Sequence, residues 1–60
     1  MPNFSQTELN AIREIVMGHQ VSASKLSDYA GRCQDEKLRG MFTNAAQEAN
    51  KSAKQLIQML

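Results

Sequence analysis

The chain has 60 residues, with seven Lys and Arg, six Asp and Glu, and a formal net charge of +1. A balanced charge without a basic cluster gives no electrostatic signature for nucleic-acid binding. The single Cys excludes an intrachain disulfide, and no apolar run approaches the ~18 residues that span a bilayer. Residues 1–5 lack the charged and apolar regions of a secretory signal. We therefore expect a small protein made in the cytoplasm, without nucleic-acid or membrane partners.

The first predicted helix begins at a recognisable cap. Ser5 and Glu8 fit a capping box, in which each side chain bonds the backbone N–H of the other residue. An apolar or small residue then recurs at alternating steps of three and four: Leu9, Ile12, Val16, His19, Ala23, Leu26, Ala30 and Cys33. This heptad pattern predicts a helix over about residues 6–32. Gly18 offers an alternative end near Met17, but the pattern keeps its phase across Gly18 and favours a continuous helix.

Charged residues mark the connection between the helices. A turn is predicted at about 33–35, where Asp35 is a suitable N-cap for a second helix. The spacing of Asp28 with Arg32, and of Asp35 with Arg39, predicts two ion pairs between residues i and i+4. These features favour a short, sharply defined turn.

The second helix repeats the pattern of the first. Apolar or small residues recur at steps of four and three: Leu38, Phe42, Ala45, Ala49, Ser52, Leu56 and Met59. This spacing predicts a helix over about residues 36–59. The middle of the segment is occupied by small side chains, which would allow close approach of a neighbouring helix.

Two long helices and a short turn make an αα-hairpin, so we predict one all-α domain over residues 1–60. Each apolar stripe is wider than one neighbouring helix can cover, and a chain this short buries little core by itself. We therefore predict a homodimer of hairpins that forms an antiparallel four-helix bundle. The residues expected in its core and dimer interface are Leu9, Ile12, Val16, His19, Leu26, Leu38, Phe42, Ala45, Ala49 and Leu56.

Few residues of the sequence are candidates for metal binding or catalysis. His19 is the polar residue of the first repeat, and we favour a core-edge histidine held by a hydrogen bond over a metal ligand. Four-helix carboxylate sites use Glu-x-x-His, whereas Val16 occupies the Glu position here. A site shared between subunits and built from His19 and Glu48 remains an alternative. Cys33 is interpreted as a small buried side chain, with a cross-link between chains as its alternative. No Ser or Cys has a His and an acid at helical spacing, so we expect neither enzymatic activity nor a cofactor.

Three short stretches resemble a known family. They read Leu-Ser-Asp-Tyr-Ala at 26–30, Cys-Gln-Asp-Glu-Lys-Leu at 33–38 and Met-Phe at 41–42. From about Phe4 to Leu60 the chain resembles the small CotF-like spore coat proteins of spore-forming Firmicutes. The resemblance implies a ferritin-like helical hairpin, deposition in or near the spore coat, and no enzymatic role.

We therefore expect a structural or assembly protein of the spore coat that acts through helix–helix association, with itself and with other coat proteins. Two other functions stay open. One is a ferritin-like metal-binding or redox protein with an intersubunit site. The other is a small regulatory adaptor that binds an amphipathic helix of another protein.

Overall fold

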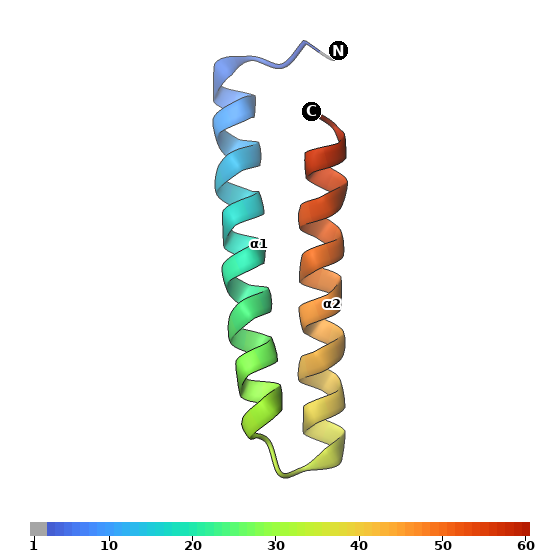
Figure 1. The fold of residues 1–60 in the computed structure, drawn as a ribbon. Coiled ribbons are helices and arrows are strands. Elements are labelled where there is room, and N and C mark those ends of the chain that lie inside the picture. Colours follow the sequence, from blue (N-terminus) through green and yellow to red (C-terminus); the bar gives the residue numbers. More distant parts are fainter. Residues whose placement is uncertain (1–2) are drawn as a thin grey trace.

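The computed structural model describes residues 3–60, which form two antiparallel helices joined by a short turn (Figure 1). Helix α1 covers Gln6–Arg32 and helix α2 covers Glu36–Gln58, and the two chain ends lie at the same end of the molecule. Residues 3–60 contain no strand. The predicted all-α helical hairpin is thus confirmed. Met1 and Pro2, which belong to the segment considered for a secretory signal, lie outside the described residues.

Helix α1 begins at the predicted capping box. The Ser5 hydroxyl accepts from the Glu8 backbone N–H at 3.1 Å, and the Glu8 carboxylate accepts from the Ser5 N–H at 2.8 Å. The helix then continues through Gly18 without a break. Val16 and Ala23, on either side of that glycine, are both buried. Their packing offsets the low helix propensity of glycine, because tertiary contacts contribute more to helix stability than propensity does.

The turn needs no left-handed residue, since no residue among 3–60 has a positive φ. Cys33 leaves the helix in an extended conformation, and the Asp35 carboxylate accepts from the Leu38 N–H at 2.7 Å as the N-cap of α2. The predicted Asp35–Arg39 ion pair is wrong, because the Asp35 carboxylate caps the helix and Arg39 pairs with Glu36 at 3.5 Å instead.

The other predicted ion pair, Asp28–Arg32, is confirmed at 3.3 Å on the exposed surface of α1. At the far end of the chain, α2 stops at Gln58, one residue before the expected end. The Met59 and Leu60 N–H groups donate to carbonyls three residues earlier, at 3.1 and 3.0 Å. The final turn is therefore tighter than an α-helical turn, as is common at helix ends.

The hairpin is a thin rod with a very small interior. Its Cα atoms extend over 46 × 14 × 10 Å, and the radius of gyration is 14.2 Å, against roughly 10 Å for a compact domain of this length. The buried apolar side chains are Val16, Ala23, Ala30, Ala46 and Ala53. Because four of these five are alanines, the backbones of α1 and α2 lie close together but enclose little apolar volume. Larger apolar groups are left at the sides of the rod.

Candidate association surface

The contact between the helices follows the predicted repeat of α1 closely. The buried or half-buried residues from the start of α1 to the turn are Leu9, Ile12, Val16, His19, Ala23, Leu26, Ala30 and Cys33. Every other residue of α1 is exposed. The heptad spacing therefore identifies the side of α1 that faces α2.

Helix α2 uses a slightly different row from the one predicted. Its buried or half-buried residues are Phe42, Ala46, Ala49, Ser52, Ala53 and Leu56. Ala46 lies against α1, while its neighbour Ala45 is exposed. Leu38 is also exposed, at 41% of its surface. Leu38 and Ala45 therefore lie beside the helix–helix contact, and their place in a dimer interface stays a prediction.

One side of the rod is lined by apolar and small residues on both helices. On α1, Ile15, Ser22 and Tyr29 are seven residues apart and lie next to the half-buried residues Ile12, His19 and Leu26. On α2 and its C-cap Met59, the corresponding exposed or half-buried row is Leu38, Ala45, Ser52 and Met59, next to Phe42, Ala49 and Leu56. We call these thirteen residues the apolar face.

An aromatic contact shows that the two rows lie on the same side of the hairpin. The rings of Tyr29 on α1 and Phe42 on α2 are tilted by 48°, with centroids 6.4 Å apart. Tyr29 nevertheless leaves 54% of its surface exposed, and Ile15 leaves 49%. The apolar face is therefore continuous across the two helices and uncovered in the single chain.

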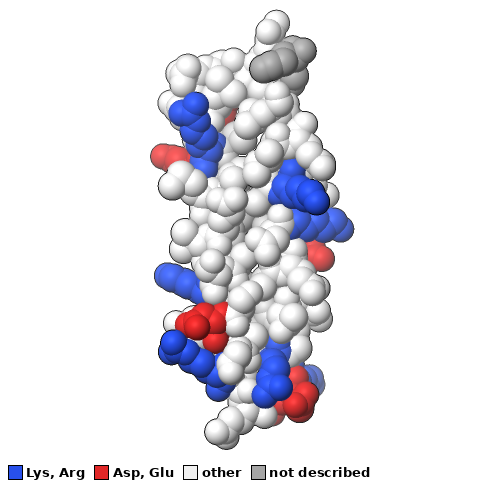
Figure 2. Space-filling model, in the orientation of Figure 1, with Lys and Arg blue, Asp and Glu red and all other residues white. Residues whose placement is uncertain are grey.

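The rows that flank the helix–helix contact on the opposite side of the rod are mostly polar, although exposed Met17 and Val21 lie beside Gln20 there. These rows are Arg13, Gln20 and Ser27 on α1 and Thr43, Asn50 and Ile57 on α2, and all six are exposed. Only Ile57 among them is apolar. We call these six residues the polar face. Figure 2 shows one face of the rod, on which charged side chains gather along the two long edges and near the turn. The long edges are therefore solvated, and the rows that flank the helix–helix contact differ in polarity between the two sides of the rod.

Side-chain size varies along the apolar face. Large groups, Ile12 and Leu56 among them, lie near the chain ends, and Leu26 and Phe42 lie near the turn. Between them the face carries His19, Ser22, Ala45, Ala49 and Ser52. A second hairpin related by a two-fold axis through the middle would therefore meet large groups with large groups near both ends, and small groups together with His19 in the middle.

The polar candidates are not gathered into a chemical site. His19 is half-buried in the helix–helix contact and Glu48 is exposed on α2. Within residues 3–60, no three His, Cys, Asp or Glu side chains are grouped so that they could hold a metal ion. A metal site made by His19 and Glu48 would need a second chain, so it stays an alternative. Cys33 is a half-buried free thiol at the turn.

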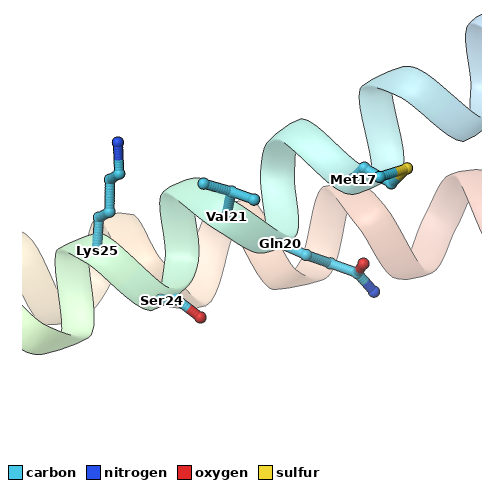
Figure 3. A pocket seen from close by; sticks show the side chains of 5 residues that line it. All are labelled: Met17, Gln20, Val21, Ser24 and Lys25. Atoms are coloured by element: carbon cyan, nitrogen blue, oxygen red, sulfur yellow. The ribbon is translucent and has the colours of Figure 1, made fainter.

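A shallow groove of about 340 Å³ lies on α1 (Figure 3). Its lining residues are Met17, Gln20, Val21, Ser24 and Lys25, all from this one helix. Met17 and Val21 are exposed there, at 63% and 55%. A groove bounded by a single helix cannot enclose a small molecule as binding pockets do.

The described helices include none that is long and apolar enough to cross a membrane. Comparison of the chain with protein-family models, with curated proteins and with solved structures found no match. The fold and its surfaces are therefore the basis for a functional proposal.

Proposed function

We propose that this chain is a structural or assembly protein that works by pairing with a second copy of itself through the apolar face. The exposure of that face on one side of the rod, opposite a polar face, is the observation that carries the proposal. Pairing would convert two thin rods into an antiparallel four-helix bundle, in which each helix has neighbours on two sides.

The exposed area supports a second copy as the occupant of this face. A compact protein of 6.7 kDa exposes about 3,900 Å² by the scaling of surface with mass, whereas this chain exposes 4790 Å². The excess is about 900 Å², close to the ~800 Å² that each partner buries in a standard protein interface. In this proposal one copy of the same hairpin supplies the missing layer, and the distribution of large groups toward both ends of the face supports a two-fold interface.

The resemblance to small CotF-like proteins supports the spore coat as the place where such bundles are deposited. A coat component needs stable surfaces for assembly and no catalytic centre. In this proposal, the charged long edges of the bundle would remain outside and be available to other coat proteins. A fluorescent fusion in a sporulating bacterium should collect at the forming coat; a diffuse signal throughout sporulation would argue against this location.

Sedimentation equilibrium tests the pairing with matched substitutions. Ile15→Asp and Ala45→Asp each put a carboxylate on the apolar face at a position that is exposed in the single chain, so the hairpin itself tolerates them. Gln20→Asp and Asn50→Asp are the controls, because they add the same charge on the polar face. We expect the wild type and both controls to be dimers, and both face variants to dissociate at least tenfold more readily.

Two outcomes would contradict the proposal. A wild-type chain that is monomeric at every concentration, with full helix content by circular dichroism, would instead favour an adaptor with an open surface for another helix. Equal dissociation constants for face and control variants would show that association uses a different surface.

A further inference from the structure

His19 stands out on the apolar face because of where it lies. The chain contains one histidine, and it is located midway along α1, among the small residues of the face. Of the side chains on this face, only His19 normally changes its charge between pH 5 and 8. The imidazole is half-buried between the helices in the single chain, so water still reaches it there.

The surroundings of His19 offer no charge to compensate a proton. Its neighbours one turn away on α1 are Ile15, Val16, Ser22 and Ala23, none of which is charged. On α2, Ala49 is as far from Gln34 in the turn as His19 is, so Ala49 lies at the level of His19, and Ala46, Ser52 and Ala53 lie within about one helical turn of that level.

The nearest charges on α2 lie outside the rows that face His19. Glu48 borders the apolar face but is exposed, and Lys51 and Lys54 are exposed on other sides of α2. Glu14 and Arg13 on α1 are likewise exposed, and neither belongs to the apolar face. When the partner's Glu48 stays at the exposed border of the face, an imidazolium covered by these rows of a second hairpin lies among apolar and small groups, which disfavour a buried charge.

We propose that protonation of His19 turns self-association off, so that the bundle is stable at neutral pH and separates into single hairpins in mildly acidic solution. This inference rests on the proposed function, since it concerns the same face. A two-fold axis through the middle of that face would also bring the two His19 side chains near each other, and two positive charges there would repel.

The direction of the pH effect on dimer stability follows from the linkage between proton binding and association. Covering the imidazole with a partner lowers its affinity for a proton relative to the separated chain. The dimer is therefore most stable where the imidazole of the separated chain is neutral, and it loses stability as the pH falls and that imidazole takes up a proton. If both histidines of the dimer must be neutral, the dissociation constant rises with up to the second power of the proton concentration.

Sedimentation equilibrium of the full chain at pH 7.5 and pH 5.5 tests this inference, with helix content followed by circular dichroism. We expect a wild-type dissociation constant that rises by at least about tenfold on acidification. His19→Gln keeps a neutral polar side chain that does not titrate, so its dissociation constant should change less than threefold over the same range. His19→Leu should be equally insensitive to pH and should associate more tightly than the wild type.

The experiment distinguishes a failure of the His19 inference from a failure of the proposed self-association. A wild-type dimer at pH 7.5 whose dissociation constant changes less than threefold at pH 5.5 would overturn the role of His19 alone. The same would follow if His19→Gln responded to pH as strongly as the wild type. A chain that does not dimerise at pH 7.5 would overturn the proposed function, and the His19 switch with it.

Discussion

Arg39 reaches back from the first turn of α2 and binds the carbonyl oxygen of Cys33, the residue that ends α1. Its Nη2 and Nε groups donate to this one oxygen at 2.7 and 3.2 Å. The carbonyl groups at the end of a helix lack partners within the helix, and a cationic side chain is favourable beside them. The guanidinium thus joins the end of one helix to the beginning of the next.

Replacing Arg39 should weaken the hairpin at this turn. Arg39→Met removes both hydrogen bonds but keeps an unbranched side chain with good helix propensity, and we expect it to cost about 1 kcal/mol in the free energy of unfolding. Arg39→Lys should recover only part of this loss, because an ammonium cannot reproduce the planar fork. Urea unfolding at fixed protein concentration measures the free energy of unfolding of both variants. Lys51→Met serves as a control on the exposed surface of α2. A loss no larger than that of the control would show that the turn is stable without Arg39.

The capping box of α1 should give the chain a specific response to acid. The pKa of the Glu8 carboxyl lies below its usual value, because the Ser5 backbone N–H donates to it and the Ser5 side chain adds a smaller effect. A pKa that is lowered by folding means that the ionised carboxylate stabilises the folded chain. This stabilisation is fully present above the unfolded pKa of the carboxyl, 4.5, and is lost as the pH falls through the lower, folded value.

Glu8→Gln tests this response, since glutamine can still complete a capping box but does not ionise. The wild type should lose more stability than Glu8→Gln between pH 6 and pH 3, as measured by urea unfolding. Glu14→Gln, at an exposed position on the same helix, should behave like the wild type. Parallel acid curves for the wild type and Glu8→Gln would contradict the role of this carboxylate.

The heptad pattern predicts α1 better than α2, for a reason that is visible in the residues. In α1 every position of the predicted repeat is buried or half-buried, although the large apolar residues Ile15, Met17, Val21 and Tyr29 lie outside it. In α2 the pairs Ala45-Ala46 and Ser52-Ala53 place small residues at two adjacent positions. Either the row with Ala45 and Ser52 or the row with Ala46 and Ala53 can lie against a neighbouring helix, and side-chain size does not distinguish the two rows. The structure buries Ala46 and Ala53 and leaves Ala45 exposed.

Interactions that depend on competition between partners were harder to predict than the helices. Spacing alone pairs Asp35 with Arg39, but it cannot show that the Leu38 N–H and the Cys33 carbonyl are better placed partners for these side chains. The continuous apolar face was also not visible as one surface in the sequence. Its recognition requires the relative rotation of α1 and α2, which the contact between Tyr29 and Phe42 defines.

Gly40 offers a direct way to stabilise the hairpin. It lies within α2, and a Cβ atom added there would meet nothing within 4 Å. Gly40→Ala should therefore increase the free energy of unfolding by about 1 kcal/mol, because alanine has the higher helix propensity and a less flexible unfolded chain. Thermal unfolding by circular dichroism measures the gain. An unchanged or lower stability would indicate that the backbone at Gly40 makes a contact, with a second chain for example, that excludes a methyl group.

The Tyr29–Phe42 contact can be measured with a double-mutant cycle. Phe42→Ala removes a half-buried ring and should cost more than Tyr29→Ala, whose ring is more exposed. With centroids 6.4 Å apart and a tilted geometry, the rings should be coupled by about 0.5–1 kcal/mol. Tyr29 and Leu56 lie toward opposite ends of the rod, so the same cycle for that pair should give no coupling. If Tyr29 and Phe42 were also additive, the two rows would not be joined across the hairpin, and the apolar face would not act as one surface.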